Sequence, residues 1–237
     1  MKLSYEYGTQ TIEFEVIFRK RKTMAIQIQP PDIVTVISPK GVKEDEILKA
    51  VKTKSKWITQ KLFQIREMEY LKRNREYVNG ESFVYMGRNY SLQIIIDESY
   101  KVPEAKLFRG KFYVYTHSTD ADTIRRALEK WYKKKALQKV LERIDYYQKY
   151  FDVSPNKVMI KEQKKRWGSC SSHRNLYFNW KCIMAPSPVL DYLVVHEMSH
   201  MVHMNHSPEF WNLVRSIIPD YEERRKLLKN QGVKYDL

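Results

Sequence analysis

The chain has 237 residues, of which 43% are hydrophobic and 13% aromatic, enough to bury a core in one large domain or two smaller ones. This composition excludes a disordered chain, and the lack of any run of about 18 apolar residues argues against a membrane helix. The 43 basic residues exceed the 28 acidic ones by 15, a charge that favours polyanionic partners without identifying one.

Two further features indicate a cytoplasmic protein. Cys170 and Cys182 are too few for a disulfide framework and are expected to be buried thiols, and the first six residues lack the apolar core of a signal peptide.

The basic residues gather in three short clusters, Arg19–Lys22, Lys133–Lys135 and Lys161–Arg166. Clusters spread in this way are typical of a solvated surface, and binding to nucleic acid remains an alternative use for them.

The N-terminal third alternates apolar and polar residues and then changes period. Apolar side chains recur at every second position over Ile12–Phe18, Ile26–Ile28 and Val34–Val36, which predicts a small antiparallel sheet broken at Pro30-Pro31. From Glu44 the apolar spacing becomes helical, and this long helix ends before Asn79-Gly80.

The middle of the chain returns to short strands before a second long helix. We expect strands at Phe83–Met86, Tyr90–Ile96 and Lys106–Tyr115, the last containing a hairpin turn at Arg109-Gly110. Thr119 or Asp120 can cap the helix, which continues to about Tyr150. The sequence thus predicts an α+β fold, with a β-rich N-terminal module over residues 1–118, a second module over 119–237, and no internal repeat.

Four of the six histidines fall within eleven residues, and two of them form the pattern His196-Glu197-x-x-His200. Ser187 as a cap and Pro188 in the first turn predict a helix through this motif. Residues four apart share one face of a helix, so His196 and His200 can bind one metal ion. Glu197 projects about 100° away from His196, which places it as a general base for a water rather than as a ligand.

A catalytic zinc site needs a third protein ligand. His203 would lie roughly 10 Å along the axis from His196 if the helix continued. Asn205 tolerates the left-handed conformation that ends a helix, so the chain can turn there and bring back His206. We therefore favour His206, with His203 or Glu209 as alternatives.

Residues outside the motif are also candidates for the site. Arg166 could stabilise an oxyanion or a substrate carboxylate, and the alternative is a structural role. The alternating segment Leu176–Ile183 predicts a strand, either an edge strand that pairs with extended substrate or an interior one. Trp167-Gly168 is interpreted as a packing and turn element, and the segment after Ser207-Pro208 as a helix that supports the metal helix.

Taken together, these residues resemble the YgjP-like family of zinc-dependent metallohydrolases, within the zincin group. The resemblance covers most of the chain and rests on a set of motifs: Gly87–Tyr90, Trp131-Tyr132, Arg166–Ser171, Leu176–Pro186, Asp191-Tyr192, His196-Glu197 and Asn205–Trp211. It implies that His196, His200 and His206 bind Zn²⁺ and that Glu197 is the catalytic base. The ten-residue spacing from His196 to His206 also resembles metzincins, which have glycine where this chain has His203.

The leading hypothesis is a zinc-dependent hydrolase that attacks peptide bonds with a metal-activated water, which makes peptides or proteins the expected partners. One alternative is a nucleic-acid-associated metalloprotein that docks through its basic surface. Another is a non-catalytic protein with a closed zinc site, in which Cys170 or Cys182 is the fourth ligand.

Overall fold

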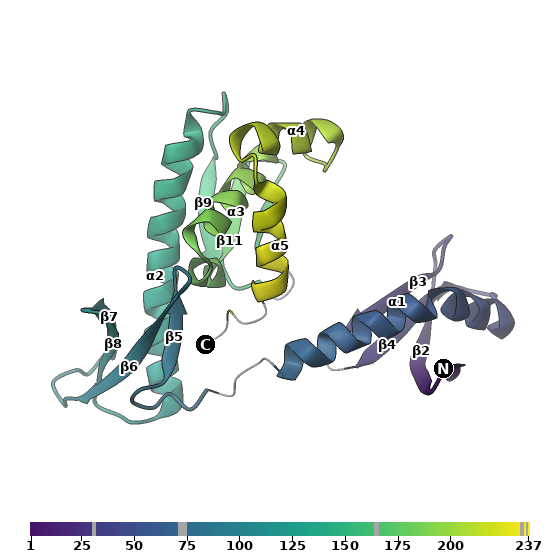
Figure 1. Ribbon diagram of the computed structural model, residues 1–237, viewed down its shortest axis with the longest axis horizontal. Coiled ribbons are helices and arrows are strands. Elements are labelled where there is room, and N and C mark those ends of the chain that lie inside the picture. The colour runs from purple at the N-terminus through teal and green to yellow at the C-terminus, as the bar shows by residue number, and fades with distance from the viewer. Residues whose placement is uncertain (30–31, 71–74, 164–165, 233–234, 236) are drawn as a thin grey trace. The chain divides into compact units, whose positions relative to one another are not determined.

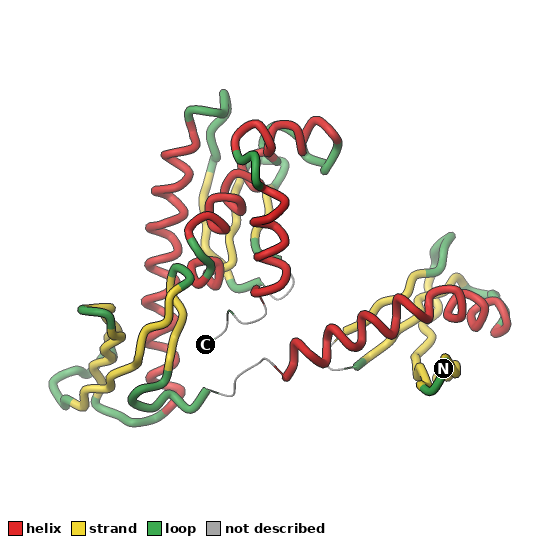
Figure 2. Tube along the Cα trace, in the orientation of Figure 1, coloured by secondary structure: helices red, strands yellow, loops and turns green. Residues whose placement is uncertain are grey.

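The chain folds into two compact units, Met1–Arg73 and Asn74–Leu237 (Figure 1). The computed structural model describes residues 1–29, 32–70, 75–163, 166–232, 235 and 237. The predicted break at Pro30-Pro31 and part of the basic cluster Lys161–Arg166 lie outside the described residues. Helices and sheets occur in both units, which confirms the predicted α+β class (Figure 2).

The first unit is a four-stranded sheet followed by one long helix. Its elements are β1 (Lys2–Tyr7), β2 (Gln10–Arg19), β3 (Ala25–Gln29), β4 (Ile33–Pro39) and α1 (Glu44–Tyr70). The strand order is β1-β2-β4-β3, with β2 and β4 parallel and the outer pairs antiparallel. The expected purely antiparallel sheet is therefore wrong, because β4 pairs with both β3 and β2 and so runs alongside β2 in the same direction.

The second unit begins with the same arrangement. Its elements are β5 (Ser82–Tyr85), β6 (Arg88–Ile96), β7 (Glu104–Phe108), β8 (Lys111–Thr116) and α2 (Ala121–Gln148). The order β5-β6-β8-β7, the central parallel pair and the following long helix all match the first unit. The chain thus contains a repeated topology that its side-chain pattern did not reveal, contrary to the expectation of no internal repeat.

Strands β5 to β8 belong with α2. The rings of Phe112 and Trp131 lie 4.8 Å apart, and the hydroxyl of Tyr132 donates to the carbonyl of Val84 at 2.7 Å. These contacts explain why the units divide between Arg73 and Asn74 and not near Ser118, where the sequence had placed a boundary. Asp120 caps α2, as one of the two predicted candidates, by accepting from the amide of Thr123 at 2.8 Å.

The described remainder of the second unit is a small sheet, one 3-10 helix and three α-helices. It comprises β9 (Lys157–Lys161), β10 (Gly168–Cys170), β11 (Asn175–Asn179), the 3-10 helix η1 (Trp180–Met184), α3 (Ser187–Ser199), α4 (Pro208–Ile217) and α5 (Tyr221–Gln231). The sheet order is β10-β11-β9. The predicted strand Leu176–Ile183 stops at Asn179, whose side chain accepts from the amide of Lys181 and begins η1. It is an interior strand, so the edge-strand interpretation is wrong.

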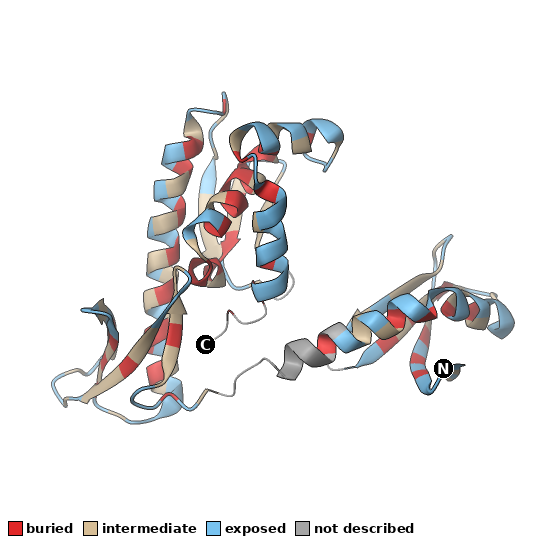
Figure 3. Cartoon of the chain, viewed as in Figure 1, coloured by how far each residue is buried: buried red, intermediate tan, exposed pale blue. Residues whose placement is uncertain are grey.

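Helix α3 is the buried centre of this unit (Figure 3). Its starting residue is Ser187, with Pro186 at the cap position, so the expected Ser187 side-chain cap is absent. The turn between β5 and β6 supports the segment before α3, because the amides of Met86 and Gly87 donate to the carbonyls of Ile183 and Met184 at 2.9 Å. Gly87 is required there because it has φ +76° and an added β-carbon would lie 2.8 Å from Pro186.

An ion pair fixes α3 against α2. Arg143 on α2 binds Asp191 on α3 through two contacts, Nε to Oδ1 at 2.6 Å and an Nη to Oδ2 at 3.2 Å. Such a two-point contact fixes the orientation of α3 relative to α2 as well as the distance between them.

Within the described ranges, none of the helices has both the length and the apolar character needed to cross a bilayer.

Candidate metal centre

Three imidazoles converge at the C-terminal end of α3. His196 lies in the last turn of the helix, His200 caps its end, and His206 comes from the loop that leads to α4. Their ring centroids are 4.6–5.1 Å apart, and one nitrogen from each lies within 4.8 Å of the others. The Nε2 atoms of His196 and His206 are separated by only 3.2 Å. Of the alternatives raised from sequence, neither His203 nor the exposed Glu209 is in this group.

The chain reverses direction between His200 and His206 in two steps. The amide of His203 donates to the carbonyl of Ser199 at 2.9 Å, which ends the helix in a turn. Ser207 then occupies the cap position of α4, so His206 stands immediately before a new helix. The prediction that Asn205 makes the turn in a left-handed conformation is wrong, because Asn205 is not among the residues with positive φ.

Hydrogen bonds at Nδ1 orient the imidazoles of His196 and His200. Nδ1 of His200 lies 3.0 Å from the carbonyl oxygen of His203, to which it can only donate. Nδ1 of His196 faces the hydroxyl of Tyr192 at 3.5 Å. A metal-binding imidazole is normally oriented through its other nitrogen in this way. The main-chain carbonyl of His203 thus orients His200, and the hydroxyl of Tyr192 orients His196. The spacing of the histidines in the sequence did not indicate either role.

Burial favours the neutral forms of His196 and His200, and the neutral imidazole is the form that binds metal. Burial lowers the pKa of His196 to about 3, with the neighbouring His200 and His206 adding to the effect. Burial also lowers the pKa of His200, although its hydrogen bond to the His203 carbonyl acts in the opposite direction. Three imidazoles at this spacing fit a transition-metal ion, which prefers nitrogen donors.

Glu197 is buried beside the histidines, with 4% of its surface exposed. Its Oε2 has no hydrogen-bond partner within the described residues. Burial raises the pKa of Glu197 to about 8, and only the charge of Arg166 opposes this rise. A buried carboxylate without a partner is costly, and a nearby cation would relieve that cost. The carboxylate therefore supplies a second observation that fits a metal ion at this site.

Gly168, the first residue of β10, lets Glu197 occupy its position. A β-carbon added at Gly168 would lie 2.6 Å from Oε1 of Glu197 and 2.7 Å from its γ-carbon, distances that real β-carbons do not show. The sequence suggested a turn element at Trp167-Gly168, but Gly168 is in a strand and its missing side chain provides space for the carboxylate.

Helix α4 forms an aromatic wall beside the imidazoles, as expected for the supporting helix. The ring of Phe210 lies 4.5 Å from that of His200 and 5.0 Å from that of His196. The indole of Trp211 stacks on His206 at 5.4 Å with an angle of 21° between the planes. These rings limit the movement of all three imidazoles.

The remaining candidates lie at or outside the edge of the cluster. Arg166 is exposed, its carbonyl accepts from the side chain of Asn179 at 3.4 Å, and its charge lowers the pKa of Glu197. Both cysteines are free thiols, and burial raises the pKa of Cys182 to about 12 and that of Cys170 to about 11. Among the described residues neither joins the histidine group, which argues against a closed site with a cysteine ligand.

Comparison with known proteins identifies a metallopeptidase family. The family model for the YgjP-like metallopeptidase domain matches residues 22–231. No curated protein matches the chain. Among solved structures, it is similar to the metallopeptidase zymogen of Pyrococcus abyssi abylysin, at 20% identity and a TM-score of 0.35, over 39% of this chain and 95% of that one. The metallopeptidase zymogen of Methanocaldococcus jannaschii jannalysin gives 20% identity and a TM-score of 0.32, over 42% and 95% respectively.

Proposed function

The chain belongs to the YgjP-like family of metallopeptidase domains, and we propose that it is a zinc-dependent peptidase with Glu197 as its general base. His196, His200 and His206 are the proposed ligands. One observation carries the proposal: three imidazoles meet beside a buried carboxylate whose Oε2 has no partner among the described residues. A structural metal site has no need of such a carboxylate, whereas hydrolysis requires a base.

Zinc is the proposed ion because an all-histidine donor set is one that catalytic zinc sites use. Bound here, it would supply a Lewis acid that polarises a substrate carbonyl and makes water a better nucleophile. The HExxH pattern resembles that of the zincin group, and the third histidine, ten residues after the first, resembles the spacing of metzincins. His203 stands where metzincins have glycine. Its main-chain carbonyl accepts a hydrogen bond from Nδ1 of His200, so this turn orients a proposed metal ligand.

Glu197 is proposed to accept the proton of the attacking water at Oε2. The oxygen is buried and unpartnered among the described residues, so a water molecule entering the site meets an available acceptor. A positive charge next to the carboxylate favours its ionised form, which can act as a base. After attack, the same group can pass the proton to the leaving amine. Arg166 is a proposed stabiliser of the developing oxyanion, because its guanidinium is a permanent positive charge near Glu197.

Peptides and proteins are the proposed substrates, as the name of the family implies. We also propose a cytoplasmic location, in which Cys170 and Cys182 would remain thiols.

The function can be tested with an unfolded protein as substrate. The full chain is incubated with casein in the presence of zinc, with and without a chelator, beside Glu197→Gln and the control Glu209→Gln. Glu209 is exposed and lies outside the histidine group, so its variant should retain activity. The parent should hydrolyse casein only with metal, and Glu197→Gln should be slower by about 10²–10⁴-fold. Hydrolysis by Glu197→Gln at the parental rate would exclude the proposed base.

A further inference from the structure

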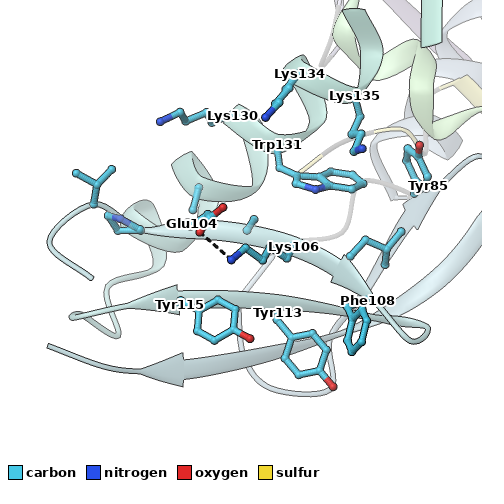
Figure 4. A pocket seen from close by; sticks show the side chains of 15 residues that line it. Tyr85, Glu104, Lys106, Phe108, Tyr113, Tyr115, Lys130, Trp131, Lys134 and Lys135 are labelled. Atoms are coloured by element: carbon cyan, nitrogen blue, oxygen red, sulfur yellow. Dashed lines mark ion pairs between the residues drawn. The ribbon is translucent and has the colours of Figure 1, made fainter. Parts of the chain in front are cut away.

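A groove in the second unit, distant in sequence from the histidines, follows the free edge of strand β7 (Figure 4). It encloses about 790 Å³ and is lined by β7, by the neighbouring strand β8 and by the N-terminal half of α2. Within the described residues β7 pairs with β8 alone, so its other edge has no strand beside it. The groove is the space between this edge and helix α2, which also contacts β7.

The hairpin turn determines which main-chain groups point to that edge. Arg109 and Gly110 both have positive φ, 44° and 78°, as in a type I′ two-residue turn. In such a hairpin the residues flanking the turn, Phe108 and Lys111, form a hydrogen-bonded pair, and bonded and non-bonded pairs then alternate. Ala105 and Leu107 consequently direct their amides and carbonyls away from β8, toward the groove.

The charge of the lining is strongly positive. It includes four lysines and a single acid, Glu104, which is already paired with Lys106 at 3.1 Å. Lys130 and Lys134 are exposed, lie one helical turn apart on α2, and form no ion pair within the described part of the chain. A lysine-bearing edge repels another basic strand, which protects against pairing between copies, but it attracts an acidic one.

Two aromatic residues of the groove, Tyr115 and Trp131, argue against stacking of nucleic-acid bases. The ring of Tyr115 stacks on Tyr100 at 5.0 Å and is also covered by the Lys106 ammonium at 5.4 Å. Trp131 packs edge-on against Phe112 at 4.8 Å and against Tyr85 at 5.0 Å. Single-stranded nucleic acid needs open ring faces on which its bases can stack. Tyr115 and Trp131 are engaged in these contacts and serve instead as apolar walls.

We propose that this groove binds an acidic, extended segment of a partner protein, which adds as a strand to the free edge of β7. The main chain of the segment pairs with Ala105 and Leu107, and its acidic side chains meet Lys130 and Lys134. This is the general mode of recognition by strand addition, in which main-chain bonds give affinity and side-chain contacts give selectivity. It is a binding activity and does not depend on hydrolysis.

The charge component is tested with the full chain and a fluorescent peptide that alternates glutamate and threonine, followed by anisotropy. The double variant Lys130→Glu/Lys134→Glu should weaken binding by roughly tenfold or more, since each charge contact is changed from attraction to repulsion. Lys52→Glu/Lys56→Glu is the matched control, because these lysines are also exposed, lie on a long helix and have the same spacing. A peptide with glutamine for glutamate should bind weakly to every form.

The strand component is tested without altering the protein. Two versions of the peptide carry N-methyl groups on either the odd or the even residues, which removes one set of main-chain donors in each. Strand addition requires that one version bind like the parent peptide and the other lose binding. The proposal would be overturned if both N-methylated versions bound equally well. It would also be overturned if Lys130→Glu/Lys134→Glu and the control Lys52→Glu/Lys56→Glu lost binding equally, or if the protein bound a single-stranded oligonucleotide but not the peptide.

Discussion

The carboxylate of Glu197 rests against Gly168, a residue whose absent side chain leaves room for Oε1. The two residues are far apart in sequence and lie on different elements, α3 and β10. The position of the proposed base is therefore set by a strand as well as by its own helix.

Gly168→Ala should move this carboxylate. The added methyl group would lie within 3 Å of three atoms of Glu197, so the side chain must shift. We expect casein hydrolysis to fall by about tenfold to a hundredfold, while bound zinc remains near the parental level because no histidine is displaced. The cost in unfolding free energy should be about 1–3 kcal/mol. Ser169→Ala, at the next position of β10, is the control. Unchanged hydrolysis in Gly168→Ala would show that the contact does not position the base.

The raised pKa of Glu197 predicts a pH effect in the metal-free protein. Burial raises this pKa to about 8 in the folded chain, against 4.5 for the ordinary carboxyl. The unfolded chain thus loses its proton first, and Glu197 makes the folded state less stable as the pH rises from about 4.5 to about 8. With a chelator present, Glu197→Gln should therefore gain stability relative to the parent over that interval. The measurement is urea denaturation at several pH values, and a difference that does not change with pH would contradict the shift.

The ion pair between Arg143 and Asp191 should contribute to the stability of the second unit. Asp191→Asn removes a two-point contact that is partly buried and joins α2 to α3. We expect a loss of about 1–2 kcal/mol in urea denaturation. Glu142→Gln is the control, since Glu142 pairs with Lys139 on the exposed side of α2 and should cost under about 0.5 kcal/mol. Equal effects of the two changes would mean that the contact between the helices contributes nothing beyond surface charge.

Local signals predicted the parts of this protein that depend on neighbouring residues. The helical spacing from Glu44, the hairpin turn at Arg109-Gly110 and the Asp120 cap are all present in the structure. The motif at His196 was predicted to lie on a helix for the same reason, and it does.

Features that depend on distant residues were missed or misjudged. The parallel pairing of β2 with β4 and the division at Arg73 arise from contacts between segments far apart, which periodicity does not report. Likewise, the space that Gly168 leaves for Glu197 depends on the packing of β10 against α3. The strand predicted from Leu176 is too long because the alternation of apolar and polar residues continues into η1. The side chain of Asn179 ends the strand by capping η1.

The most direct test of the proposed metal centre is the metal content of histidine variants after saturation with zinc and removal of the excess. His203 is the matched control for His206, because both follow the end of α3 and only His206 lies in the cluster. The parent and His203→Ala should retain zinc in a one-to-one ratio with the chain, whereas His206→Ala should lose most of it. Full retention by His206→Ala together with loss from His203→Ala would contradict the three-histidine centre on which the account rests.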